Sequence, residues 1–300
     1  MISVVIPHYR GKEKIVTALS QNLPFLKDCE VIVVNDYPHQ SIRKEMASRF
    51  PSVVLIENKI NLGFAGAASV GIRAAKNPFV MLLNDDVILH DDIPIKSVTH
   101  FEKNKELFAV SFRQAEKNNI FVGRNRIVWK NGFFQHSAAD SSQSGINGWA
   151  EGGAMLMDKE KYEKINGFDM LFSPFYWEDI DLSYRAWKAG YEILFDSNVT
   201  VEHHHESTIS THFKKSYIQT IAYRNQFITI WKNISDGKML AEHTLFLLKN
   251  LVIYSLKGDF SFGKGFLLAV ALLPTILQKK EKQKSMWRMN DRQIFDTFKG

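Results

Sequence analysis

A single cysteine, Cys29, occurs among the 300 residues of the chain. It excludes an intrachain disulfide, which suits a reducing compartment, and its place before an apolar run predicts a buried, unreactive thiol. The N-terminus lacks the basic stretch and apolar segment of a signal peptide, so we expect no translocation. The longest apolar run, 266–277, is well short of the about 20 residues that span a bilayer, so we expect no membrane-spanning helix.

Several catalytic signatures are absent as well. The chain has no cysteine cluster and no HExxH helix, so we expect no zinc site, and it has neither a GxSxG elbow nor a Walker loop. Hydrophobic residues make up 45% of the composition, which suffices for a sizeable core. The formal net charge of +6 suits nucleotide diphosphates, nucleic acid or an anionic membrane, and does not choose among them.

The sequence does contain a regular alternation of strand and helix signals. Strand-like runs lie at 2–6, 31–34, 53–56 and 79–83, with helical spacing at 12–26, 40–50 and 65–76. This order predicts an α/β domain with a parallel sheet and right-handed crossovers. Further along we expect strands and loops over 108–148, a strand entered over 149–157, a helix over 179–189, short strands at 191–195 and 199–201, and helices from 212 onward.

Polar residues follow each of the four early strands, at 7–10, 35–36, 57–58 and 84–86. These positions fall at the carboxyl ends of parallel strands, where open α/β sheets bind ligands, so they predict a nucleotide-type site. Asp85 and Asp86 are adjacent acids that repel each other unless a cation lies nearby, and their oxygens suit Mg²⁺ or Mn²⁺. A solvated turn that caps the next helix is the alternative.

Three further segments carry candidate chemistry. The small residues of 61–69 open a helix to which a phosphate or polar ligand edge could come close, although helix packing explains them equally well. At 177–182 three acids follow an aromatic loop, which suits a sugar acceptor and a proton-accepting carboxylate; helix capping explains one or two of the acids. The histidines at 203–205 include a candidate metal or diphosphate contact, or else lie packed or exposed at a strand end.

Taken in order, these segments resemble family 2 glycosyltransferases of the GT-A fold, in particular the rhamnosyltransferase-like bacterial branch. The matching stretches are 4–9, 33–36, 61–66, 82–87, 151–156, 167–169, 178–182 and 201–203, so that the resemblance covers about residues 1–232. It implies a Rossmann-like, mostly parallel nucleotide-binding sheet flanked by helices, in a catalytic domain over 1–212. The nucleotide-sugar half would cover about 1–107, the acceptor half about 108–212, and a helical extension 213–300.

The resemblance also implies roles for individual residues. Asp36 would contact the nucleotide base and Asp179 would be the catalytic base. Asn84 and Asp86 take the outer positions of the family's DxD motif, although Asn84 replaces its first aspartate, and Ser69 replaces a common asparagine. The full expected set is Pro7, Tyr9, Asp36, Asn61, Gly63, Asn84 and Asp85 for the nucleotide sugar; Asp86, Asp85 and His203 for Mn²⁺ or Mg²⁺; and Trp149, Trp177, Glu178 and Asp181 for the acceptor.

The implied activity is inverting transfer of a sugar from a UDP, dTDP or GDP donor to a glycan or lipid-linked acceptor in bacterial surface polysaccharide synthesis. We expect a cytoplasmic enzyme at the inner face of the plasma membrane, with no nucleic-acid partner. The apolar, lysine-rich C-terminal helices would contact membrane or form a homodimer. One alternative is a sugar nucleotidyltransferase, which would need a long Gly-rich loop where 7–11 stand. The other is a degenerate fold that only binds a glycan or partner, which Asn84 leaves open.

Overall fold

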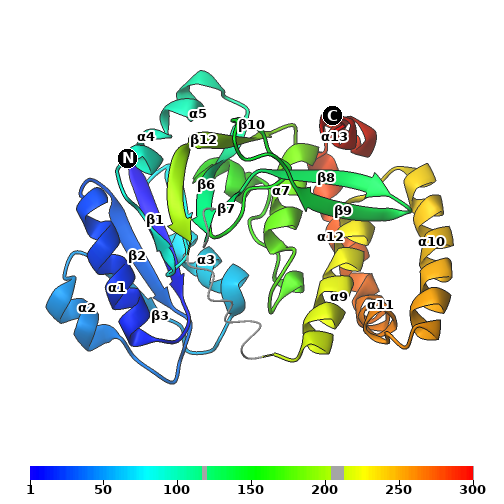
Figure 1. The fold of residues 1–300 in the computed structure, drawn as a ribbon, viewed down its shortest axis with the longest axis horizontal. Helices are drawn as coiled ribbons and strands as arrows, with labels where there is room; N and C mark the ends of the chain where they lie inside the picture. The colour runs from blue at the N-terminus through cyan, green and yellow to red at the C-terminus, as the bar shows by residue number, and fades with distance from the viewer. Residues whose placement is uncertain (117–119, 204–212, 300) are drawn as a thin grey trace.

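The computed structural model describes residues 1–116, 120–203 and 213–299, which form a ten-stranded mixed sheet with helices on both faces (Figure 1). The predicted alternation in the first third is confirmed. Its elements are β1 (Ile2–His8), α1 (Lys12–Asn22), β2 (Glu30–Asn35), α2 (Arg43–Arg49), β3 (Val54–Glu57), α3 (Gly63–Ala74) and β4 (Phe79–Leu83). Because β1 pairs in parallel with both β2 and β4, their carboxyl ends lie side by side at one edge.

The rest of the sheet is not parallel throughout. The strand β11 (Ala154–Asp158) runs antiparallel between β4 and β6 (Leu107–Glu116), and β12 (Glu192–His203) pairs in parallel with β6. The two short strands expected at 191–195 and 199–201 are one strand, β12, with a register irregularity between Asp196 and Thr200. Smaller elements are β5 (Val87–Ile88), α4 (Ile93–Lys96), α5 (Thr99–Lys103), β7 (Ile120–Val122), β10 (Gly145–Ile146), α6 (Lys159–Lys164) and η3 (Met170–Phe172).

Apolar residues bury both faces of this sheet. Val4 and Ile6 of β1 pack into one cluster with α1, α2 and α5, whereas Val5 faces a second cluster that includes α3 and α7 (Glu178–Lys188). Alternate side chains of a strand point to opposite faces, so a strand covered by helices on both sides must be apolar throughout. The strand ends are therefore the places left for polar chemistry.

The C-terminal region is helical, as expected, and joins the second cluster. It contains α9 (Lys215–Asn233), α10 (Gly237–Leu256), α11 (Ser261–Ala271), α12 (Leu273–Gln283) and α13 (Asp291–Thr297), which lie beside the hairpin of β8 (Asn125–Lys130) and β9 (Phe133–Ala138) (Figure 1). The expected boundary at 212 falls outside the described residues. Within them, no single helix combines the length and apolarity of a membrane span, although the pair 261–271 and 273–286, bent by 64°, does so together.

Candidate active site

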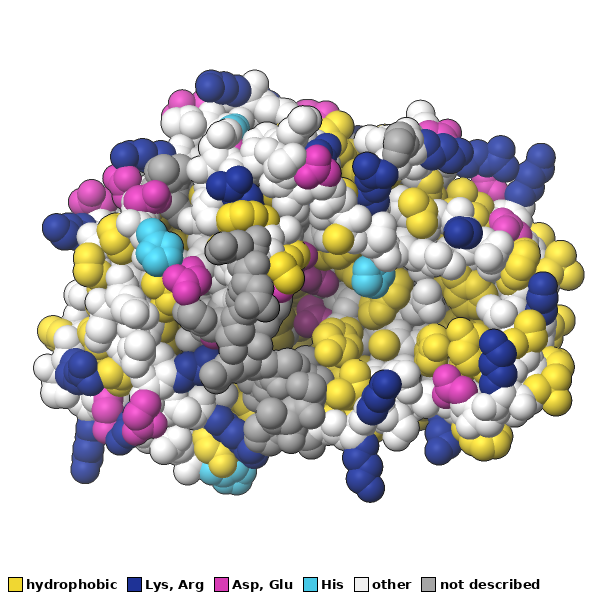
Figure 2. All heavy atoms as spheres, viewed as in Figure 1, with side chains coloured by type: hydrophobic (Ala, Val, Ile, Leu, Met, Phe, Trp, Pro, Cys, Tyr) yellow, Lys and Arg dark blue, Asp and Glu magenta, His cyan; other side chains and the backbone are white. Residues whose placement is uncertain are grey.

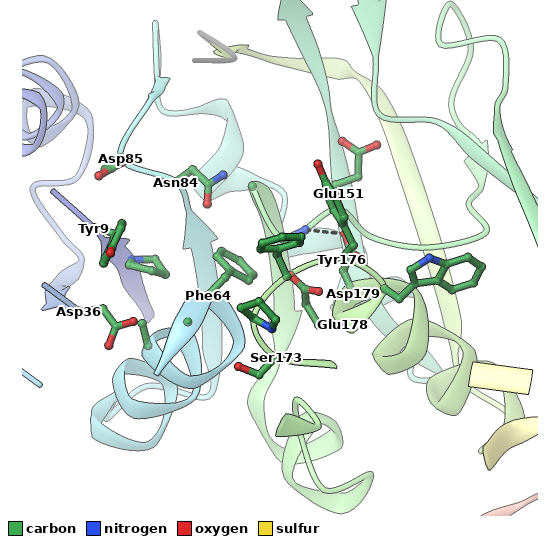
Figure 3. Close-up of a pocket in the computed structure, with 18 of the residues that line it drawn as sticks. Tyr9, Asp36, Phe64, Asn84, Asp85, Glu151, Ser173, Tyr176, Glu178 and Asp179 are labelled. Atoms are coloured by element: carbon green, nitrogen blue, oxygen red, sulfur yellow. Dashed lines mark hydrogen bonds between the residues drawn. The ribbon is translucent and has the colours of Figure 1, made fainter. Parts of the chain in front are cut away.

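A cleft of about 1250 Å³ opens at the carboxyl ends of β1, β2 and β4. All residues predicted for the site line it except Asp181. Figure 3 shows two walls: a β1 wall with Tyr9, Asp36 and Asp85, and an α7 wall with Glu178 and Asp179. The sheet therefore brings together side chains that are far apart in sequence, such as those of Pro7 and His203.

On the β1 wall, Asp36 is held by hydrogen bonds from two directions. Asn58 Nδ2 donates to its Oδ1 at 2.8 Å, and the amide of Leu62 lies 3.0 Å from both carboxylate oxygens. Burial raises the pKa of Asp36, and these donors oppose that effect. Asn61 stabilises the next turn, because its Oδ1 accepts a hydrogen bond from the Gly63 amide at 2.8 Å.

Gly63 opens α3 with φ of 71°, a conformation that favours glycine. A Cβ at this position would lie 3.0 Å from the carbonyl oxygen of Pro174, which belongs to the loop of the opposite wall. The glycine therefore allows the two walls to approach each other at the bottom of the cleft.

An aromatic and cationic cluster lies beside Pro7 at the end of β1. The rings of Tyr9 and Tyr37 meet edge to face at 5.4 Å, and the Arg10 guanidinium lies 5.2 and 4.8 Å from their centroids. The position of Arg10 after Tyr9 at the strand end was the available signal for this charge, which suits an anionic ligand.

The two adjacent acids have different surroundings. Asp85 Oδ2 lies 2.6 Å from His8 Nδ1, and its Oδ1 lies 2.8 Å from Lys14 Nζ. Both oxygens of Asp85 are thus paired with protein groups, and its expected role as a metal ligand stays a prediction. Asp86 Oδ1, in contrast, is buried and accepts no hydrogen bond of good geometry, although His203 Nε2 is 3.2 Å away.

A buried hydrogen-bond chain determines which ring nitrogen of His203 donates to Gln114. Gln114 Nε2 lies 2.5 Å from Glu151 Oε2, and because a carboxylate accepts, the amide nitrogen must face Glu151. Gln114 Oε1 then faces His203 Nδ1 at 2.5 Å and makes that nitrogen the N–H donor. In the neutral ring this leaves a lone pair on Nε2, directed at the Asp86 carboxylate.

Two electron-pair donors 3.2 Å apart are the arrangement that a cation between them would stabilise. Among the described residues no group of three or more His, Cys, Asp or Glu side chains could hold a metal. Asp86 and His203 would supply two ligands, which fits Mg²⁺ or Mn²⁺ because these ions commonly take one or two protein ligands plus phosphate oxygens and water. His204 and His205 lie outside the described residues.

The α7 wall carries acids with few donors. Asp179 Oδ1 accepts from the Ile180 amide at 2.8 Å, and Oδ2 lies 3.4 Å from the Gly152 amide. Burial, followed by the charge of Glu151, raises the pKa of Asp179 to about 6. Burial and the neighbouring Asp179 raise the pKa of Glu178 to about 8, and its Oε2 is buried without a hydrogen-bond partner within the described structure.

Indole rings complete the α7 wall. Trp149 and Trp177 both line the cleft, with the His136 ring between them at centroid distances of 5.1 and 5.2 Å. Aromatic rings of this kind stack on the apolar faces of sugars. His136 and Glu151 were missing from the predicted set, because His136 comes from β9 in the irregular middle region, which gave no pattern to place it.

Two consecutive glycines, at 152 and 153, lie between the two walls. A Cβ at Gly152 would lie 2.7 Å from Phe64 Cε1, and a Cβ at Gly153 would lie 3.1 Å from His203 Cε1 and 3.2 Å from Asn84 Nδ2. The Gly153 carbonyl also accepts the Asn84 amide at 2.8 Å. This glycine pair brings the end of β4 close to the start of β11.

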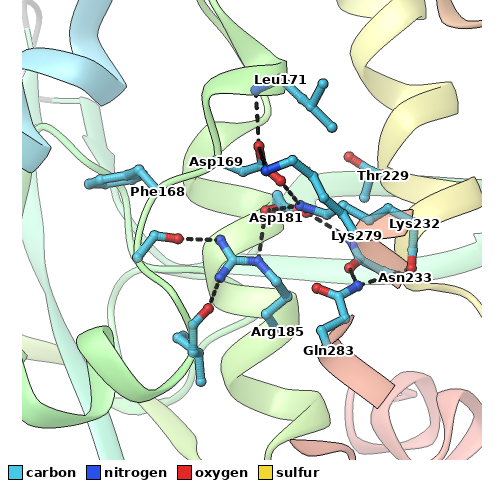
Figure 4. A network of polar contacts seen from close by, with 12 residues as sticks. Phe168, Asp169, Leu171, Asp181, Arg185, Thr229, Lys232, Asn233, Lys279 and Gln283 are labelled. Atoms are coloured by element: carbon cyan, nitrogen blue, oxygen red, sulfur yellow. Dashed lines mark hydrogen bonds and ion pairs between the residues drawn. The ribbon is translucent and has the colours of Figure 1, made fainter. Parts of the chain in front are cut away.

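Asp181 lies outside the cleft, which corrects its expected contact with an acceptor. Its carboxylate is fully buried and contacts Arg185, Lys232 and Asn233 at 2.7–2.9 Å (Figure 4). Two positions after Asp179 on a helix, the side chain points to another face, toward α9. A buried carboxylate with these partners stabilises the contact between α7 and α9, since removing one partner would leave an unpaired charge.

These features match a known class of protein: the fold is GT-A, with a nucleotide-type cleft at the strand ends. The model of the glycosyl transferase family 2 matches residues 3–165, more than half of the chain, and a second model, the N-terminal domain of galactosyltransferase, matches 135–229. The chain belongs to glycosyl transferase family 2.

Relatives are found in bacterial polysaccharide synthesis. A poly-β-1,6-N-acetyl-D-glucosamine synthase of Staphylococcus epidermidis is 24% identical over 65% of this chain and 48% of its own length, so the chain spans about half of that relative. A rhamnosyltransferase of Escherichia coli is 21% identical over 72% of this chain and 88% of its own. The crystal structure of GalNAc-T7 with UDP, GalNAc and Mn²⁺ superposes with a TM-score of 0.60 at 14% identity, over 77% of this chain and 48% of that one.

Proposed function

We propose that this glycosyltransferase moves a sugar from a UDP, dTDP or GDP donor to a hydroxyl of a glycan or lipid-linked acceptor in bacterial polysaccharide synthesis, with inversion at the anomeric carbon. The observation that carries the proposal is the pairing of two walls in one cleft. One has the cation-type pair Asp86 and His203, and the other has Asp179 with a raised pKa. The relatives and the Mn²⁺ in GalNAc-T7 support it.

In this mechanism Asp36 and Tyr9 hold the nucleotide, and Asp86 and His203 would hold the divalent cation. That ion supplies positive charge to offset the charge of the leaving diphosphate. Asp179 takes the proton of the acceptor hydroxyl while the hydroxyl oxygen bonds to the anomeric carbon. The bond from that carbon to the diphosphate oxygen breaks, and its electron pair leaves with the nucleoside diphosphate. Attack in line with the leaving group inverts the configuration.

A donor screen tests the proposal. The protein is incubated with UDP-, GDP- and dTDP-sugars and Mn²⁺ or Mg²⁺, and slow release of the nucleoside diphosphate is followed. We expect one nucleotide class to be hydrolysed, with inversion at the released sugar seen by NMR. Release of pyrophosphate from a nucleoside triphosphate and a sugar phosphate would identify a nucleotidyltransferase, and binding without turnover would favour the degenerate fold.

We also infer that an apolar ridge on α10 and α11 docks the enzyme on an anionic bilayer at the cytoplasmic face of the plasma membrane. The ridge comprises Leu245, Leu248, Val252, Leu256, Phe260, Leu267 and Leu268, which are 44–82% exposed. Figure 2 shows hydrophobic side chains gathered on this side of the molecule. Residues 245, 248, 252 and 256 share one helix face, and exposed patches of this kind mark interaction surfaces.

The charges around the ridge favour anionic lipid. Lys249, Lys257 and Lys264 are exposed on the same segment. Its two acids are engaged within the protein, because Glu242 accepts from Trp129 and Gly132, and Asp259 accepts from the Ser261 amide. Each lysine near an anionic surface contributes about 1 kcal/mol.

Vesicle flotation tests this docking. We expect binding to phosphatidylglycerol vesicles at low salt, weak binding to phosphatidylcholine, and loss of binding in Leu248→Ser/Leu256→Ser. Ile120→Ser removes an exposed apolar side chain from β7 and should bind as the unaltered protein does. A dimer in analytical ultracentrifugation that the double substitution dissociates, without vesicle binding, would show that a second copy covers the ridge.

A further inference from the structure

One buried amide on α9 holds the loop that leads to Asp179. Asn225 is fully buried, and its Nδ2 lies 3.0, 2.9 and 2.8 Å from the carbonyl oxygens of Phe172, Phe175 and Tyr176. The amide nitrogen has two hydrogens for three carbonyl oxygens, so one hydrogen is shared between two of them. A helix remote in sequence thus determines the path of the loop.

The neighbouring residue extends this clamp. Arg224 Nε donates to Asn225 Oδ1 at 2.9 Å, which fixes which end of the amide faces the loop. Arg224 Nη2 donates to the Ser173 carbonyl at 2.5 Å. The carbonyl of Pro174, between these bonded ones, faces Gly63 of the opposite wall. The loop is therefore held from the α9 side and abuts the β1 wall on the other.

The loop needs such restraint because its backbone is strained. Tyr176 and Trp177 have φ of 70° and 74°, in the left-handed region that bulky residues rarely adopt. Strain of this kind persists only where the surroundings over-determine it, and it concentrates at functional sites. Trp177 is also the N-cap of α7 and makes no side-chain capping bond, so the loop path sets how α7 begins.

We propose that Asn225 is a positioning residue: by holding the loop through Tyr176, it sets the start of α7 so that Asp179 points into the cleft. This inference rests on the proposed function, in which Asp179 is the base. Tyr176 and Trp177, which line the same wall, are set by the same bonds.

The chain offers a matched control on the same helix. Asn233 is also a fully buried asparagine of α9, but it bonds to Asp181 and Gln283 and not to the loop. Loss of either amide leaves buried partners unsatisfied and lowers stability. Of these two asparagines, Asn225 alone bonds to the loop before Asp179, so a difference in catalysis between the two variants isolates positioning from stability.

The experiment compares Asn225→Ala with Asn233→Ala. Donor hydrolysis gives kcat and KM, calorimetry with UDP and Mn²⁺ gives nucleotide affinity, and melting gives Tm. We expect Asn225→Ala to lower kcat by about 10- to 100-fold, since small misplacements of a reacting group have effects of this size. Its UDP affinity should stay within about twofold, because the hydrogen-bond partners of the Asn225 side chain lie on the loop and on α9, and not on the β1 wall. Asn233→Ala should keep its kcat despite a similar fall in Tm.

A third variant separates shape from hydrogen bonding. Asn225→Asp keeps the size of the side chain and replaces the donor by an oxygen that repels the three carbonyls, so its kcat should fall at least as far. Should Asn225→Ala not fold, Asn225→Ser retains one donor and serves the same comparison. If the unaltered protein turns over donor and both alanine variants lose kcat equally, the inference is wrong. If the unaltered protein turns over no donor, the proposed function fails first, and the inference with it.

Discussion

On the β1 wall of the cleft, each aspartate meets a donor or a cation: Asp36 meets Asn58, Asp85 meets His8 and Lys14, and Asp86 faces Lys14 and His203. On the α7 wall, Glu178 and Asp179 lie close to each other and accept hydrogen bonds mainly from backbone amides. The first wall keeps its charge fixed, because burial raises the pKa of Asp86 but neighbouring hydrogen-bond donors and positive charges, Lys14 among them, outweigh that effect. The second wall raises the pKa of its acids toward neutrality, where a group can exchange a proton.

Gln114 connects these two environments. It bonds to Glu151, whose charge acts on Asp179, and to His203, which faces Asp86. The two walls therefore differ because their acids have different neighbours. The neutral side chain of Gln114 bonds to both sets of neighbours and transfers no charge between them. Five substitutions test this comparison.

Asp86→Ala should have the largest effect. It removes one of the two proposed cation ligands, and the loss of several kcal/mol of charge stabilisation corresponds to a fall in kcat on the order of 10³-fold. Donor hydrolysis with and without excess EDTA measures it. Asp85→Asn is the comparison, and should lower activity less because its oxygens pair with His8 and Lys14. Full activity of Asp86→Ala, or of the unaltered protein in EDTA, would contradict the assignment.

Asp179→Asn comes next, because it keeps the shape of the side chain and removes the proton acceptor. We expect kcat to fall by about 10²-fold or more, with UDP affinity unchanged. Glu178→Gln is the matched substitution one position earlier. If Glu178→Gln loses more activity than Asp179→Asn, the base is Glu178 and the assignment to Asp179 is wrong.

Gln114→Leu should weaken Mn²⁺ binding by about 10- to 100-fold, since such losses follow when the group that orients a metal-binding histidine is removed. Paramagnetic titration of Mn²⁺ with UDP present measures the affinity without turnover. Gln114→Glu keeps an acceptor for His203 but places a carboxylate beside Glu151. An unchanged Mn²⁺ affinity in Gln114→Leu would show that His203 needs no orienting partner.

The pH profile tests the α7 wall. A base must be ionised to accept a proton, so the rate should rise as pH rises through the pKa of Asp179, about 6. Glu151→Gln removes a charge that raises this pKa, so the acid limb of the profile should move to lower pH. The same shift in Glu45→Gln, whose carboxylate pairs with Lys12 away from the cleft, would indicate a global effect instead.

The smallest effect concerns stability. The pKa of Glu178 is raised from 4.5 to about 8 in the folded protein, so its ionisation makes folding less favourable as pH rises from the unfolded value towards 8. Glu178→Gln avoids this cost and should raise Tm by a few degrees at pH 8 and hardly at pH 4.5. Thermal melts at both pH values measure it, and an equal change at the two would contradict the raised pKa.

Much of the fold followed from local sequence patterns. Val- and Ile-rich runs are typical of buried parallel strands, so β1 to β4 were predictable together with the strand-end position of Asp36 and Asp86. The periodicity of apolar residues predicts a strand but not whether it pairs in parallel or antiparallel. The antiparallel pairing of β11 was therefore not predicted. Strand β12 was predicted as two short strands, because the apolar pattern is interrupted where the register is irregular, between Asp196 and Thr200.

The site was predictable where motifs are contiguous and not where it depends on packing. Asp179 and Asp181 stand two positions apart in one acidic run, and only the contacts of α7 with α9 show that one faces the cleft and the other Lys232. Gln114 and Asn225 are single neutral side chains within ordinary strand and helix patterns. Their importance arises from partners that are 37 and 50 residues away.

For protein engineering, the two glycines at 152 and 153 are positions where substitution is not tolerated. Any side chain there would overlap Phe64, or press on His203 and Asn84. A library that aims to change the accepted sugar would therefore lose most of its members at these two positions. Randomising Tyr176 and Phe213, which lie half-exposed along the same cleft, leaves the spacing between the walls intact.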